Sequence, residues 1–109
     1  MKQFILEYSS EAKQDLIQIK RYIKYTLNEI EIAEKLISKI LNEISKLKIH
    51  PEIFPIIDDE FIRKLKLRKL IVDNYIVFYR IQNNSIQIVR IIYAKRNYIN
   101  LLMLSLIYS

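Results

Sequence analysis

The chain has 109 residues, about half of them apolar, and a net charge of +6. This length suits one small domain with one core, so we expect a single domain over residues 1–109. The absence of cysteine excludes disulfides, thiolate metal sites and cysteine catalysis, and agrees with a reducing compartment such as the cytoplasm. The first residues turn polar too soon for an export signal, and the apolar run 99–108 is about half the ~20 residues of a membrane helix.

The positive charge is concentrated in the C-terminal half. Residues 1–62 hold nine Lys/Arg and eleven Asp/Glu, whereas residues 63–109 hold nine Lys/Arg and a single acid, Asp73. This distribution favours a polyanion or an acidic protein as partner. A solvated basic surface that serves solubility is the alternative interpretation.

Residues 3–8 (QFILEY) have the composition of a short strand, and a helix follows them. Ser9 and Ser10 are both placed to cap its N-terminus. Apolar residues then recur at helical spacing, namely Ala12, Leu16, Ile19 and Ile23. This helix is expected to end near Leu27.

A second helix follows after a short connection. Asn28 and Glu31 have the spacing of a capping box, and a wide apolar stripe continues to Leu47. The helix is expected to end at His50-Pro51, because proline disfavours helical geometry in the residue before it. The two helices therefore form an antiparallel hairpin.

Three strands rich in β-branched and aromatic residues are expected at about 66–73, 75–81 and 86–94. They follow an irregular segment, 51–62, that contains two prolines. The order β-α-α-β-β-β predicts an α+β fold in which a helical hairpin precedes a three-strand antiparallel meander. No linker or internal repeat interrupts this order.

Asn83-Asn84 suits a two-residue hairpin turn, in which both central residues take positive φ. A turn centred there would pair Phe78 with Val89 and Val77 with Arg90. Because the chain has no glycine, asparagine is the expected residue at left-handed positions. The natural turn candidates are therefore Asn28, Asn74, Asn83, Asn84 and Asn97.

Two features that resemble catalytic or metal sites are weak. His50 is the only histidine and has no partner motif. The acidic run 58–60 lies in a proline-flanked loop, where such carboxylates are usually solvated or paired with cations such as Arg63 and Lys64. The sequence therefore predicts no metal site and no cofactor.

Five cations lie within seven residues near the start of the first C-terminal strand: Arg63, Lys64, Lys66, Arg68 and Lys69. So dense a cluster is expected to lie near an anion or near the acidic run. If residues 66–73 form a strand, Arg68 and Lys69 point to opposite faces of the sheet.

Cations and aromatic residues also surround the last strand. Arg90 lies inside it, where a structural pairing with Asp73 or Glu7 is as plausible as a functional role. A further set follows at the strand end and could bind phosphate and stack on bases: Tyr93, Lys95, Arg96 and Tyr98.

Several segments, taken in this order of elements, carry a family resemblance: YSSEAKQDLIQIKRYI, PEIFPIID, RKLIVDNYIVFYRI and IQIVRIIYAKRNYINLL. They resemble the RelE/ParE superfamily of toxins from bacterial type II toxin–antitoxin systems, which includes plasmid stabilisation proteins. The resemblance covers about residues 3–102 and leaves 103–109 as a tail beyond the usual family end. It implies a small antiparallel sheet packed on a helical hairpin.

The resemblance also implies partners. A small acidic antitoxin would lay an amphipathic segment across the helices and the basic face of the sheet. The implied assembly is a homodimer or a toxin–antitoxin hetero-oligomer, with no membrane involved.

The superfamily has two activities. RelE-like members cleave mRNA on the ribosome without a metal, using Lys, Arg and Tyr side chains as base, acid and charge stabiliser. ParE-like members poison DNA gyrase. Lys69 and Arg96 match basic positions of the nuclease, and Tyr93 or Tyr98 could serve as its tyrosine. However, Ile76 and Leu102 stand where the nuclease has an arginine and its terminal tyrosine.

The long hairpin, Arg68-Lys69 and the VFYRI run resemble ParE more closely, so the expected activity is gyrase binding. An mRNA endonuclease that uses Lys69, Arg96 and Tyr93 is the enzymatic alternative, and a non-toxic binding module is the third. For target binding, the sequence nominates Arg63, Lys64, Lys66, Arg68, Arg90, Lys95 and Tyr98.

Overall fold

The computed structural model describes residues 3–107. Its strands are β1 (Ile5–Tyr8), β2 (Arg68–Val72), β3 (Tyr75–Gln82) and β4 (Ser85–Tyr93). Its helices are α1 (Ser10–Arg21), the π-helical turn η1 (Tyr22–Thr26), α2 (Ile30–Lys46), the 3₁₀ helices η2 (Pro51–Ile53) and η3 (Arg63–Leu65), and α3 (Tyr98–Ile107). None of the helices within the described range is long and apolar enough to cross a membrane.

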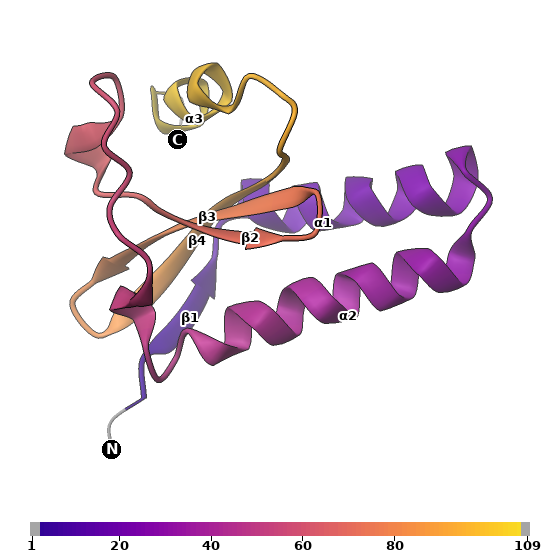
Figure 1. The fold of residues 1–109 in the computed structure, drawn as a ribbon, viewed down its shortest axis with the longest axis horizontal. Coiled ribbons are helices and arrows are strands. Elements are labelled where there is room, and N and C mark those ends of the chain that lie inside the picture. The colour runs from indigo at the N-terminus through magenta and orange to yellow at the C-terminus, as the bar shows by residue number, and fades with distance from the viewer. Residues whose placement is uncertain (1–2, 108–109) are drawn as a thin grey trace.

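The four strands form one sheet in the order β1-β4-β3-β2. β2, β3 and β4 form the predicted antiparallel meander, and β1 pairs parallel to β4 at one edge. The α1–α2 hairpin lies on one side of the sheet, and α3 with residues 57–67 lies on the other (Figure 1). The predicted α+β fold is therefore confirmed.

The sheet separates two apolar clusters. The hairpin-side core includes Ala12, Ile19, Ala33, Ile40, Ile44, Leu70, Val77, Tyr79 and Ile88. The α3-side core consists of Ile62, Leu67, Ile76, Phe78, Val89, Ile92 and Leu102. Phe78 and Tyr79 are adjacent in β3 and both fully buried, but they belong to different cores. The sheet is therefore covered on both faces.

The first helix begins as predicted, and the second does not. The Ser9 hydroxyl accepts a hydrogen bond from the Ala12 backbone N–H at 2.9 Å. Asn28, however, has a φ of 55°, which is incompatible with the extended geometry of an N-cap. Glu29 takes the N-cap position without a capping side-chain bond, so the predicted capping box is wrong. The helix also ends at Lys46, earlier than predicted.

The turn between β3 and β4 is centred on Asn83-Asn84 as predicted, and the register that follows from it holds as far as Tyr79 but shifts by one residue beyond that. Phe78 lies opposite Arg90, and Tyr79 opposite Ile88, so Val89 is an extra residue in a β-bulge. The predicted pairs Phe78–Val89 and Val77–Arg90 are therefore wrong.

Left-handed backbone occurs at Asn28, Lys66, Asp73 and Asn83 among the described residues. Of the asparagines expected as turn residues, Asn74, Asn83 and Asn84 lie in turns. Positive φ occurs at Asn28 and Asn83 but not at Asn84, where the predicted two-residue turn required it. Lys66, at φ 57°, ends η3 and lies outside β2, so it does not belong to the predicted strand.

The predicted tail is largely helical. Residues 103–107 continue α3, and residues 108 and 109 lie outside the described range. Leu102 is fully buried against the sheet and anchors this helix in the α3-side core.

Candidate binding groove

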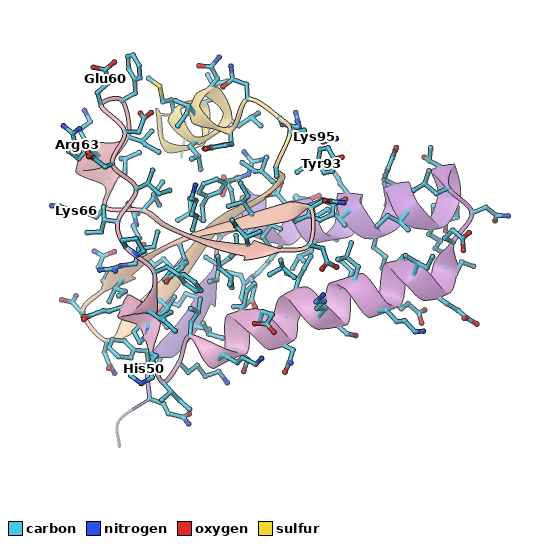
Figure 2. All side chains as sticks on the ribbon, viewed as in Figure 1. His50, Glu60, Arg63, Lys66, Tyr93 and Lys95 are labelled. Atoms are coloured by element: carbon cyan, nitrogen blue, oxygen red, sulfur yellow. The ribbon has the colours of Figure 1, made fainter. Side chains whose placement is uncertain are left out.

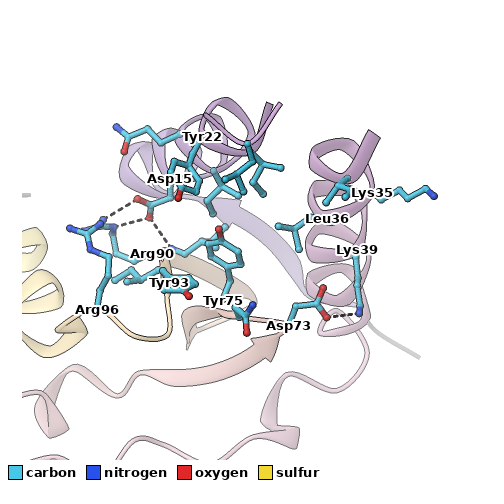
Figure 3. Close-up of a pocket in the computed structure, with 18 residues that line it drawn as sticks. Asp15, Tyr22, Lys35, Leu36, Lys39, Asp73, Tyr75, Arg90, Tyr93 and Arg96 are labelled. Carbon is cyan, nitrogen blue, oxygen red and sulfur yellow. Dashed lines mark hydrogen bonds and ion pairs between the residues drawn. The ribbon is translucent and has the colours of Figure 1, made fainter. Parts of the chain in front are cut away.

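A groove of about 880 Å³ lies between the helical hairpin and one end of the sheet (Figure 3). One side is formed by α1, η1 and α2. The other is formed by the β2–β3 turn, the start of β3, the end of β4 and the connection to α3. Its apolar lining comprises Ile19, Ile23, Leu27, Ile32, Leu36, Ile91 and Ile92.

Three tyrosines also line the groove: Tyr22, Tyr75 and Tyr93. The rings of Tyr75 and Tyr93 make an edge-to-face contact, with centroids 5.6 Å apart and planes at 64°. Burial raises the pKa of the Tyr75 hydroxyl, and nearby Tyr93 and Tyr22 raise it further. Tyr75 therefore stays neutral at physiological pH and offers a hydrogen-bonding tip on an apolar ring.

Asp15 of α1 binds Arg90 of β4 beside the groove. Arg90 Nε lies 2.8 Å from Asp15 Oδ2, and Nη2 lies 2.9 Å from Oδ1. Oδ2 also accepts the Ile91 backbone N–H at 2.8 Å. Both side chains are largely buried, 14% exposed for Arg90 and 11% for Asp15, so their charges neutralise one another away from solvent.

A second ion pair crosses the opposite rim. Lys39 of α2 donates to Asp73 Oδ1 in the β2–β3 turn at 2.6 Å. Both side chains are about half exposed, so this pair contributes little stability, but it joins the helical side of the groove to the sheet side. The bond to Asp73 is the main cause of a raised Lys39 pKa.

Lys35 and Arg96 are the remaining charges of the groove lining. Neither makes an ion pair or side-chain hydrogen bond with the residues at 3–107. Because Asp15 and Asp73 already have cationic partners, the groove carries uncompensated positive charge on two sides. It combines an apolar lining with two cations at its rim.

The predicted nuclease residues do not assemble at one place. Tyr93 and Arg96 line the groove. Lys69 lies opposite Phe78 in the β2–β3 pair, and residues directly opposite share a face, so Lys69 is on the α3 side of the sheet. Ile76 is 5% exposed and Leu102 fully buried, both in the α3-side core.

Arg68 and Arg90 have structural partners. Arg68 Nη1 donates to the Phe54 carbonyl and so fastens the irregular segment to β2. Arg68 lies opposite Tyr79, on the hairpin side, so the prediction that Arg68 and Lys69 serve different faces is confirmed. Arg90 pairs with Asp15, not with the predicted Asp73 or Glu7.

The acidic run 58–60 pairs with Arg63, one of the two cations predicted as its partners. Arg63 Nη2 lies 2.7 Å from Asp58 Oδ1, and Asp59 accepts the Phe61 backbone N–H at 2.8 Å. Lys64 and Lys66 make no ion pair within the described chain, and Figure 2 shows Lys66 and Arg63 at the end of the molecule away from Lys95 and Tyr93. Within residues 3–107, no three His, Asp or Glu side chains gather as a metal site.

The cations and aromatic residues predicted as one set at the end of β4 do not all lie together either. Tyr98, the first residue of α3, packs on Phe78 with ring centroids 5.2 Å apart. Lys95 lies in the connection between β4 and α3, outside the groove lining. Tyr93 and Arg96 therefore remain together, while Tyr98 faces the other core.

Several groove residues were not identified from the sequence: Asp15, Tyr22, Lys35, Lys39 and Tyr75. Asp15 could have been identified from the sequence, because it lies three residues after Ala12 and four before Ile19, on the buried stripe of α1. A lone carboxylate in that position predicts a buried cationic partner. The other four residues stand at positions that are ordinary for surface side chains, so no sequence pattern distinguishes them.

One comparison with known proteins shows the family, and a second shows a shared fold. Residues 6–98 match the family model described as the ParE toxin of the type II toxin–antitoxin system parDE. A chain of a solved structure, the chromosomal ParDE toxin–antitoxin system from P. aeruginosa, superposes with a TM-score of 0.70 at 20% identity, over 85% of this chain and 98% of that one. At that identity the likeness shows the fold alone. No curated protein matches the sequence.

Proposed function

The chain belongs to the family of ParE toxins from type II toxin–antitoxin systems, and on this premise we propose that it arrests growth by binding DNA gyrase and is neutralised by a small acidic antitoxin. Residues 1–109 would act as one domain in the cytoplasm, where gyrase works. The observation that carries the antitoxin part is the groove, with its apolar lining and two uncompensated cations.

An acidic amphipathic segment suits this groove. Its apolar residues would pack on Leu36, Ile91 and the Tyr75 ring, and its carboxylates would approach Lys35 and Arg96 from either side. The charge already neutralised at Asp15–Arg90 would remain undisturbed. Charge complementarity of this kind accelerates association and selects against basic partners.

The placement of the basic residues favours binding over RNA cleavage. Metal-independent cleavage needs its cationic and proton-transferring groups within hydrogen-bond reach of one phosphate. Lys69 lies on the α3 side of the sheet, whereas Arg96 lines the groove between the sheet and the helical hairpin. Ile76 fills a core position on the Lys69 side, where the nuclease would have an arginine.

The gyrase proposal is tested with purified gyrase, relaxed plasmid and the purified chain. We expect inhibited supercoiling and trapped double-strand breaks that depend on gyrase, both reversed by an equimolar amount of the antitoxin encoded in the adjoining reading frame. Cellular mRNA should stay intact after induction.

Two other outcomes contradict the proposal. Cuts within translated codons that disappear in an Arg96→Ala variant would establish the mRNA endonuclease instead. Harmless expression without antitoxin, together with unaffected gyrase, would establish the non-toxic binding module.

A further inference from the structure

The connected ends of α1 and α2 form a tip, residues 20–34, that extends beyond the sheet (Figure 1). Ile23 and Ala33 are buried within it. Five large apolar side chains in the tip are between 48% and 69% exposed: Tyr22, Tyr25, Leu27, Ile30 and Ile32. Apolar surface of this density on a projecting element is typical of an interaction site.

The charges of the tip are separated by sign along the two arms. Lys20, Arg21 and Lys24 lie on the first arm, and residues 16–28 contain no acid. Glu29, Glu31 and Glu34 lie on the second arm, where residues 29–34 contain no cation. The two arms therefore carry equal and opposite charge.

These six charges do not neutralise one another within the chain. Among the described residues, none of the six takes part in an ion pair. Lys24 lies over the ring of the neighbouring Tyr25, with Nζ 5.1 Å from the centroid. The separated charges are thus available to a partner with the same pattern in the reverse direction.

A second copy of this chain is such a partner. In a two-fold symmetric interface the same patch faces itself, so a surface must be self-complementary. A tip with a basic arm, an acidic arm and apolar side chains between them meets that condition. We propose that the tip is a self-association surface, on which two copies pack arm against arm with the basic arm of each facing the acidic arm of the other.

The local backbone supports a functional role for the tip. The first arm ends in the π-helical turn η1, in which the Leu27 N–H reaches back to the Tyr22 carbonyl at 3.4 Å. π-Helical turns are rare and concentrate at functional positions. A standard protein–protein interface has about 20–30 residues on each partner, and the tip has fewer. We therefore expect association at micromolar concentration. Tyr22, Leu27 and Ile32 of the tip also line the groove, so self-association and antitoxin binding would compete for these side chains. The inference itself does not depend on the proposed toxin activity.

Sedimentation velocity of the purified chain between about 1 and 200 μM, in 150 mM salt, tests the proposal. We expect a concentration-dependent dimer that weakens as salt is raised. The variant Lys20→Glu/Arg21→Glu/Lys24→Glu and the variant Glu29→Lys/Glu31→Lys/Glu34→Lys should each be monomeric. An equimolar mixture of the two should recover a dimer, because each variant then complements the other.

Matched variants control for net charge and for apolar content. Lys64→Glu/Lys66→Glu/Lys95→Glu makes the same charge change away from the tip and should leave the dimer intact. Tyr25→Ser/Ile30→Ser should weaken the dimer at least tenfold, whereas Ile53→Ser/Phe61→Ser, which removes similarly exposed side chains elsewhere, should not. Circular dichroism identifies any variant that fails to fold.

A monomeric wild-type chain at 200 μM overturns the proposal, and so do charge-reversed variants that remain dimeric or that fail to pair with each other. If the tip substitutions instead impair binding of gyrase or of the antitoxin while the chain is monomeric, the tip belongs to that partner and the self-association proposal is wrong.

Discussion

Asp15 and Arg90, 75 residues apart in the chain, form a bidentate ion pair that joins α1 to β4. The same carboxylate accepts the backbone N–H of Ile91, immediately after the β-bulge. The Ser9 hydroxyl donates to the Val89 carbonyl at 2.7 Å on the other side of Arg90. The start of α1 thus holds the backbone of β4 where pairing with β1 has ended.

Asp15→Asn should destabilise the fold by about 3 kcal/mol, because it leaves a largely buried guanidinium without its counter-charge. Urea unfolding at pH 7, followed by circular dichroism, measures the change. Asp58→Asn is the matched control. It also removes an arginine partner, but its side chain is 82% exposed, so the expected loss is below about 1 kcal/mol. Equal effects of the two substitutions would contradict a structural role for the buried pair.

Tyr79→Phe should destabilise the protein by about 1–2 kcal/mol. The fully buried Tyr79 hydroxyl donates to the Pro51 carbonyl at 2.8 Å, so phenylalanine leaves that carbonyl without its donor. Thermal unfolding measures the loss. Tyr25→Phe, at a 69% exposed position, should change the melting temperature by less than about 2 °C. An unchanged Tyr79→Phe protein would show that solvent replaces the lost bond.

Stability should fall at alkaline pH. Burial raises the pKa of Tyr8, Tyr75 and Tyr79 above the ordinary value of 10.0. As pH rises, the unfolded chain therefore loses these phenolic protons first, so stability is retained below about pH 10 and declines as pH approaches the folded-state pKa values. Urea unfolding from pH 8 to 11, with tyrosinate absorbance in parallel, measures this. Tyr79→Phe should show a shallower decline, and a parallel curve would exclude Tyr79 as a contributor.

Charge reversal at the groove should weaken antitoxin binding. Arg96→Glu and Lys35→Glu should each raise the dissociation constant about tenfold or more, because a carboxylate on the groove rim repels an acidic segment. Lys95→Glu makes the same change one residue away, outside the groove lining, and should have a several-fold smaller effect. Isothermal titration at two salt concentrations measures all three. A larger effect of Lys95→Glu would move the binding surface away from the groove.

Hydrophobic periodicity and capping chemistry were sufficient to predict most of the fold. The stripes of α1 and α2, the Ser9 cap and the Asn83-Asn84 turn depend on neighbours within a few residues, and the structure confirms them. The bulge at Val89 lies instead beside hydrogen bonds from Ser9 and Asp15, which are far away in sequence. No local pattern in β4 could have shown it.

The candidate site was predicted less well, for a similar reason. The alternation of side chains along β2 correctly predicted that Arg68 and Lys69 lie on opposite faces of the sheet. Whether Lys69 shares a surface with Arg96 depends on how the chain turns after β4, which no periodicity encodes. The groove also needs residues from α2 and from the β2–β3 turn, brought together only by packing.

A chain without glycine reverses direction at residues that have a Cβ. At Lys66 the left-handed backbone stores strain of the order of 1 kcal/mol, without the local hydrogen bonding that helps asparagine or aspartate tolerate it. In return, each such residue restricts the unfolded chain more than glycine would. The balance between local strain and chain entropy therefore differs from turn to turn. Among the four left-handed residues at 3–107, Lys66, which joins η3 to β2, is the one that is neither asparagine nor aspartate.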